Sequence, residues 1–203
     1  MNTLNEAKRL FEQQHYFDAL LLVRANLLQG PADEVVWLEL GIACLLVLNI
    51  PEQTEPLFQR LCYSFVRDKD NGAAETGFQR AIQQLRNSVA LRMQAGVFFA
   101  NTQNWNRAEE CFRAVLTLDA YHPEAWHRLG EVLLLGRRID EAFLALLQSV
   151  KIDPLNPAAH EALNRCYQHR GQPKQAGQHA ARAQTLRPFL KCHAPPSYDS
   201  DLT

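Results

Sequence analysis

Apolar residues along much of the chain recur at steps of three and four, which is the spacing of one face of an α-helix. Two such stripes follow each other in the segment 123–156. The first stripe stops at the Gly-Arg-Arg run 136–138. The second stops at Asp153-Pro154, because a proline disfavours helical geometry in the residue before it. The segment is therefore predicted to form two helices joined by a short turn.

The same pattern returns every 34 residues. Ala108, Ala142 and Ala176 occupy one column of this repeat, and Gly96 and Gly130 occupy another. Small residues at these columns allow the two helices of a hairpin to cross closely. A single hairpin of this kind cannot bury its apolar face alone and must stack on its neighbours. The sequence therefore predicts an all-α array of stacked helical hairpins.

The unit at 123–156 resembles a tetratricopeptide repeat. The motif W-x2-L-G is present as Trp126, Leu129 and Gly130, and the A-x3-F pair is present as Ala142 and Leu146. The resemblance implies a right-handed superhelix of stacked hairpins. We predict three clear repeats and two looser ones, at 89–122, 123–156, 157–190, 1–33 and 34–67.

The N-terminal half departs from the regular pattern. We predict the domain organisation as two degenerate hairpins, one inserted helix, three repeats and a flexible tail, at 1–67, 68–88, 89–190 and 191–203. Pro51 and Pro56 stand where the second helix of the second repeat should begin. Because proline is poorly tolerated inside a helix, that helix is predicted to begin near Thr54, a candidate N-cap.

Composition and charge restrict the function classes. The chain has 21 Lys and Arg against 22 Asp and Glu, a formal net charge of −1, which does not favour a nucleic-acid partner. Its five cysteines are scattered without a C-x-x-C pair, a pattern typical of reduced thiols in a cytosol. We find no signal peptide and no apolar run that could span a bilayer, and we expect a cytoplasmic protein without membrane insertion.

The sequence offers little for catalysis. It contains no nucleophile-elbow, phosphate-loop or zinc-protease motif, so we expect no enzyme activity and no cofactor. Cys166 and His169 lie one helical turn apart, with His160 nearby, but a metal site needs three or four convergent ligands and we predict none. Cys111 falls between two packed columns, which favours a buried structural thiol over a nucleophile.

The family resemblance implies a partner-binding groove lined chiefly by the first helix of each repeat. Carried onto this chain, the groove is apolar towards its N-terminal side and mixed in charge towards its C-terminal side. An apolar groove is typical of proteins that bind an amphipathic helix or an extended segment. The candidate groove residues are Val35, Leu38, Ile42, Met93, Val97, Asn101, His127, Glu131, Glu161, Arg165 and His169.

These observations predict a protein–protein interaction module that acts as an adaptor, a scaffold or a client chaperone. The carboxylate clamp of some family members is not expected, because only Arg128 among the clamp positions has the right side chain. The architecture resembles the small tetratricopeptide chaperones of bacterial secretion systems.

Two alternatives remain open. One is a self-assembling structural scaffold, including a homodimer through the N-terminal half, and the other is an accessory subunit of an enzyme or secretion complex. A second copy or the inserted helix packed on Leu38, Ile42, Val97 and Phe98 would close the groove.

Overall fold

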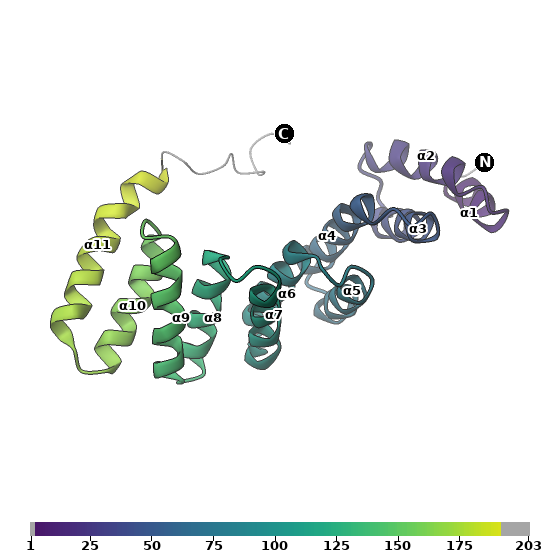
Figure 1. Ribbon diagram of the computed structural model, residues 1–203. Helices are drawn as coiled ribbons and strands as arrows, with labels where there is room; N and C mark the ends of the chain where they lie inside the picture. The colour runs from purple at the N-terminus through teal and green to yellow at the C-terminus, as the bar shows by residue number, and fades with distance from the viewer. Residues whose placement is uncertain (1–2, 192–203) are drawn as a thin grey trace. The chain divides into compact units, whose positions relative to one another are not determined.

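The computed structural model describes the backbone of residues 3–191 and the side chains through Arg187. Within that part every regular element is an α-helix, which confirms the predicted all-α class (Figure 1). The eleven helices are α1 (Thr3–Glu12), α2 (Tyr16–Leu27), α3 (Glu34–Val47), α4 (Pro51–Arg67), α5 (Asn71–Gln84), α6 (Val89–Asn101), α7 (Trp105–Leu118), α8 (Pro123–Leu135), α9 (Ile139–Ile152), α10 (Pro157–His169) and α11 (Pro173–Lys191).

The chain divides into two compact units, and the boundary lies between Phe98 and Phe99, inside α6. In the first unit, α1 packs on α2, α2 on α3, α3 on α4 and α4 on α5. In the second unit, α8 packs on α7, α9 and α10, and α10 packs on α9 and α11 (Figure 1). The hairpins α8–α9 and α10–α11 therefore lie side by side, as stacked repeats require.

Helix boundaries in the second unit follow from local chemistry. Pro123 and Pro157 each occupy the first turn of a helix, where the fixed φ of proline suits the helix and its missing N–H is no loss. Asn156 caps α10, since its Oδ1 accepts hydrogen bonds from the backbone N–H groups of Ala158 at 3.0 Å and Ala159 at 3.3 Å. The predicted break at 136–138 is confirmed, because α8 ends at Leu135.

The turn inside each hairpin uses one residue in the left-handed region. Gln103, Arg137 and Gly171, spaced by 34 residues, have φ values of 61°, 59° and 67°. The N–H of the next residue then bonds to a carbonyl five residues earlier, as from Arg138 to Leu133 at 2.9 Å. Gly136 has an ordinary φ of −76°, so the strained position falls on arginine instead.

Close helix crossing explains the small residues at the repeat columns. A Cβ placed on Gly130 would lie 2.5 Å from Cγ of Leu146, which is completely buried. Ala108 and Ala142 are completely buried and Ala176 nearly so.

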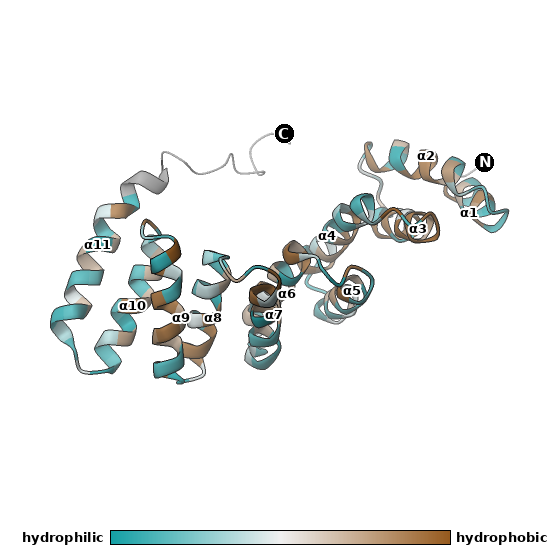
Figure 2. Ribbon diagram, viewed as in Figure 1, coloured by the Kyte–Doolittle hydropathy of each residue, from teal (hydrophilic) through white to brown (hydrophobic). Residues whose placement is uncertain are grey.

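The helices of the second unit differ in hydropathy. Helices α8 and α9 carry many apolar residues, whereas α11 is largely hydrophilic (Figure 2). The exposure of Lys174, Gln178 and Arg182 on α11 agrees with its polar outer face in the sequence.

The first unit has its own apolar core. Trp37, Leu38 and Ile42 of α3 are buried in one cluster together with Phe58 of α4 and Leu91 of α6. A second cluster joins α2 to α3 through Ala19, Leu20, Cys44 and Leu45. Helix α3 therefore contributes to two apolar clusters.

The predicted start of the fourth helix near Thr54 is wrong. Helix α4 begins at Pro51, which occupies its first turn, and Pro56 lies inside the helix with an exposed side chain. Thr54 is buried and its hydroxyl donates to the carbonyl of Ile50 at 2.7 Å instead of capping the helix. A proline in the first turn costs no hydrogen bond, so the helix begins as early as the sequence permits.

A helix forms where the inserted helix is expected. Helix α5 is capped by Asp70, whose Oδ1 accepts from Ala73 N–H at 3.0 Å, and Phe78 lies 5.3 Å from Phe98 between ring centroids. The turn before it has Lys69 at φ 59°, as in the hairpin turns. The assignment of 68–88 as an insertion, like the other domain limits, stays a prediction. The predicted tail lies outside the described residues except for Lys191.

Candidate partner-binding groove

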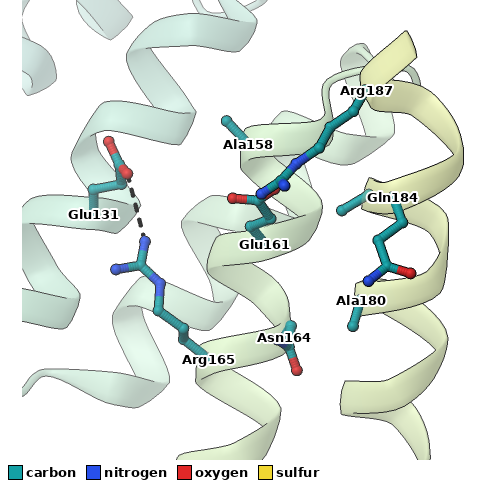
Figure 3. Close-up of a pocket in the computed structure, with 9 residues that line it drawn as sticks. Glu131, Ala158, Glu161, Asn164, Arg165, Ala180, Gln184 and Arg187 are labelled. Carbon is teal, nitrogen blue, oxygen red and sulfur yellow. Dashed lines mark hydrogen bonds and ion pairs between the residues drawn. The ribbon is translucent and has the colours of Figure 1, made fainter.

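A groove of about 550 Å³ opens on the second unit where α8, α10 and α11 meet (Figure 3). Its walls are charged and its floor is small and apolar. It is lined by Glu131 of α8, by Ala158, Glu161, Asn164 and Arg165 of α10, and by Ala180, Ala183, Gln184 and Arg187 of α11.

Two ion pairs flank the groove. Nη2 of Arg165 lies 3.5 Å from Oε1 of Glu131, and joins α10 to α8 (Figure 3). Nε of Arg187 donates to Oε1 of Glu161 at 2.8 Å, and joins α11 to α10. All four side chains are partly exposed to solvent, by 30% to 64%. Exposed pairs of this kind contribute about 0–1 kcal/mol each, so a charged or polar ligand can replace either partner at little cost.

The groove also presents two side-chain amides. Asn164 is half-buried and Gln184 is exposed, and neither makes a side-chain hydrogen bond within the described part of the chain. An amide offers both donors and an acceptor, as a peptide group does. Each of these two amides therefore offers a hydrogen-bond donor and an acceptor to a ligand, next to the alanines that line the groove.

His127 lies behind this wall without lining the groove. Its side chain is buried, and its Nε2 lies 3.7 Å from Oε1 of Glu131, too far for a hydrogen bond. Burial lowers the pKa of His127 below its ordinary value of 6.5, although the carboxylate of Glu131 opposes that shift. The imidazole is therefore neutral near pH 7, and the net charge of this wall comes from the carboxylates and guanidiniums.

The structure brings together three of the groove residues expected from the sequence, namely Glu131, Glu161 and Arg165. His127 is buried close to them, and His169 is exposed at the end of α10 outside the groove lining. These three residues come from the mixed-charge end of the predicted groove, and their role in binding stays a prediction.

The apolar end of the predicted groove needs correction at two positions. Leu38 and Ile42 are completely buried in the core of the first unit and present no surface to a partner. The periodicity of α3 marks both as apolar, but the helices packed on α3 cover them. Val35, Met93 and Val97 are partly buried, and Asn101 is exposed.

Sequence reasoning missed the whole contribution of α11. Ala180, Ala183, Gln184 and Arg187 line the groove from a second helix, whereas the family rule looks only at first helices. A signal was present in the 34-residue columns, since Ala180 stands where Leu146 stands one repeat earlier.

The histidine and cysteine side chains of α10 do not converge on a common point. His160 is buried and pairs with His179 of α11, with 2.9 Å between their Nδ1 atoms. Its Nε2 donates to the carbonyl of Pro154 at 3.1 Å. Cys166 is buried, and burial raises the pKa of its thiol to about 11. Within the described residues no three His, Cys, Asp or Glu side chains gather as a metal site would require.

The other cysteines give a similar picture. Burial raises the pKa of Cys44 to about 11 and that of Cys62 to about 12, so both thiols are protonated at neutral pH. Cys111, expected to be buried, is only half-buried, because its position on α7 lies at the edge of the packed face. Cys192 lies outside the described residues.

None of the described helices combines the length and apolar character that crossing a membrane demands.

Comparison with solved structures identifies similar folds. MamA from Desulfovibrio magneticus RS-1 superposes with a TM-score of 0.63 at 16% identity, covering 98% of this chain and 99% of that one. Another MamA crystal structure gives 0.62 at 12% identity, with 92% and 96% covered. YrrB, described as a TPR protein with an unusual peptide-binding site, gives 0.60 at 17% identity, with 95% and 89% covered. No protein-family model and no curated protein matches the sequence.

Proposed function

Because this chain has the tetratricopeptide-repeat fold, we propose that it is a protein-interaction module that binds a peptide segment of a partner protein in the groove between α8, α10 and α11. The observation that carries the proposal is the groove itself, which two ion pairs and two side-chain amides line together with three alanines. The peptide-binding site named for YrrB, a protein of similar fold, supports it.

The mechanism is recognition without chemistry. A bound segment displaces water from Ala158 and Ala180, and the flanking carboxylates and guanidiniums fix its direction. Since opposite charges alternate around the groove, a segment of mixed charge fits better than a uniformly acidic or basic one. We propose that the module serves as an adaptor, scaffold or client chaperone in the cytoplasm, with a protein partner, no nucleic acid and no catalytic step of its own.

A groove-filling substitution tests the proposal. Ala158 lies on α10 with an exposed side chain in the groove, so Ala158→Tyr fills the groove without disturbing the core. The peptides to be used are those selected from a random library by the unmodified chain. Ala158→Tyr should weaken their binding by about tenfold or more, measured by fluorescence anisotropy.

The matched control is Ala181→Tyr, on an exposed position of α11 outside the groove lining. It should bind the peptides like the unmodified chain. Equal affinity in Ala158→Tyr and Ala181→Tyr would place the binding site elsewhere and would end the proposal.

Self-association through the N-terminal half is a second candidate function, and an exposed apolar stripe favours it. Three apolar side chains on this stripe are exposed: Phe17 by 64%, Leu21 by 65% and Leu28, the C-cap of α2, by 88%. They are spaced by four and seven residues, so they lie on one side of the helix. Such a stripe matches the seam by which two helices pair.

If the chain is a dimer, Leu21→Glu should convert it to a monomer, measured by sedimentation equilibrium. Leu144→Glu, at an equally exposed leucine of α9, is the control, and a chain monomeric without any substitution would rule this function out.

A further inference from the structure

The last hairpin reverses the size pattern of the hairpins before it. One repeat earlier, Gly130 on the first helix faces Leu146 on the second, and Leu146 is completely buried. Phe112, two repeats before Ala180 in the same column, is also completely buried. A large apolar side chain in this column therefore fills the space between the two helices of the α8–α9 hairpin.

In α10 and α11 the corresponding residues are Asn164 and Ala180. The glycine is replaced by a polar side chain and the large apolar residue by a small one. Ala180 is half-buried and lines the groove (Figure 3). Ala183, which also lines the groove, is almost completely buried. Ala180 therefore lines the groove at the column where leucine stands one repeat earlier and phenylalanine two repeats earlier.

The polar groups around that space are those that a main chain can use. Asn164 and Gln184 have side-chain amides without a hydrogen bond in the described part of the chain. A helical ligand has its own backbone groups already bonded, whereas an extended segment has free N–H and C=O groups. The two amides therefore favour an extended segment over a helix.

We propose that the partner's segment is extended and inserts one large apolar side chain, leucine or phenylalanine, over Ala180 and Ala183, with the adjoining peptide groups bonded to Asn164 and Gln184. This inference rests on the proposed function and names the ligand class of the same groove. The inserted side chain takes the place that Leu146 occupies in the preceding hairpin. The ion pairs Glu131–Arg165 and Glu161–Arg187 belong to the lining of the same groove.

The test uses peptide mixtures that share one fixed central residue, with all other positions randomised. The unmodified chain should retain mixtures with central leucine or phenylalanine about tenfold better than mixtures with central alanine, aspartate or lysine, because an apolar side chain leaves water on binding. Asn164→Gly/Ala180→Leu rebuilds the earlier column and fills the space from within. It should lose that preference while its thermal unfolding midpoint stays equal or rises.

Two further variants separate loss of the groove from misfolding and from a general effect of substitution on α11. Ala180→Leu alone leaves Asn164 in place and should also lose the preference, so the inference does not depend on the folding of the double variant. Ala181→Leu, at an exposed position outside the groove, should retain it. Binding that is lost in Ala158→Tyr yet shows no preference for a large apolar residue would overturn this inference and leave the proposed function standing. Binding unaffected by Ala158→Tyr would overturn both.

Discussion

At the scale of single residues, stability in the second unit depends on how closely two helices approach. Gly130 contacts the side chain of Leu146 so closely that a methyl group has no room. Gly177 lies in α11 with nothing within 4 Å of where its Cβ would be. The same substitution should therefore have opposite effects at these two helical glycines.

Gly130→Ala should lower the free energy of unfolding by about 1–3 kcal/mol, because the new methyl group forces Leu146 or a helix to move. Gly177→Ala should raise it by about 0.5–1 kcal/mol, because alanine loses less backbone entropy in a helix. Urea unfolding followed by circular dichroism measures both. A gain of similar size in the two variants would show that helix propensity, not close packing, dominates.

The hairpin turns give a second residue-scale prediction. Arg137 has a positive φ that glycine adopts more readily, so Arg137→Gly should stabilise the protein by about 0.5–1 kcal/mol. Gly171 occupies the equivalent position one repeat later, and Gly171→Ala should destabilise by a similar amount. The two unfolding midpoints should shift in opposite directions. A lower midpoint for Arg137→Gly would mean that Arg137 makes a stabilising contact.

The buried imidazole of His127 predicts a pH dependence of stability. Burial lowers its pKa in the folded state, helped by Arg128 and Arg165 and opposed by Glu131 and Glu124. Below pH 6.5 the unfolded chain takes up a proton that the folded chain does not, so stability is complete above that pH and falls as the pH falls through the window beneath it.

His127→Gln should flatten this loss between pH 7.5 and pH 5.5, measured as the difference between urea midpoints at the two values. His169→Gln, at an exposed position of α10, serves as the control and should leave the slope almost unchanged. If the slope of His127→Gln equals that of the unmodified chain, another group causes the pH dependence.

At the scale of whole elements, the packing of α3 determines whether its apolar side chains stabilise the core or remain available to a partner. Leu38→Ala should cost about 2–5 kcal/mol of stability, because the side chain is completely buried in the first unit. Val35→Ala should cost less, since its side chain is only partly buried. Chemical denaturation of the two variants compares them directly. Unaltered stability in Leu38→Ala would restore the idea that this residue faces an open groove.

The same scale shows what the sequence could and could not predict. Helices α8 and α9 were predictable because their apolar stripes are interrupted at 136–138 and at Asp153-Pro154. The early start of α4 was missed because Pro51 was treated as a breaker instead of a first-turn residue. Periodicity shows which face of a helix is apolar, but it cannot show what covers that face, and this is why Leu38 and Ile42 were assigned to a groove.

The candidate site was predicted only in part, for a related reason. Glu131, Glu161 and Arg165 followed from the family's first-helix rule, and they do line the groove. The contribution of α11 depends on the small side chain of Ala180 and on the residues of α10 that face it. A cavity is a property of two facing columns together, so neither helix reveals it when it is considered alone.

At the scale of the whole molecule, the proposed partner-binding groove lies on the second unit. That unit combines the groove with an ion-pair cluster that ties α9 to α7, in which Arg138 joins Glu109 at 2.6 Å and Glu141 at 2.5 Å. The cluster is outside the groove lining. The proposed binding surface therefore lies on a unit whose helices α7 and α9 are also joined by ion pairs outside the groove.

The most direct test of this account is to locate the binding site by nuclear magnetic resonance. Peptides selected by the unmodified chain would be titrated into isotope-labelled protein, and backbone amide shifts followed. We predict the largest changes at the groove residues of α10 and α11, with Asn164 and Gln184 among them, and small changes in the first unit. Shifts concentrated instead on α3 or on the exposed stripe of α2 would contradict the account.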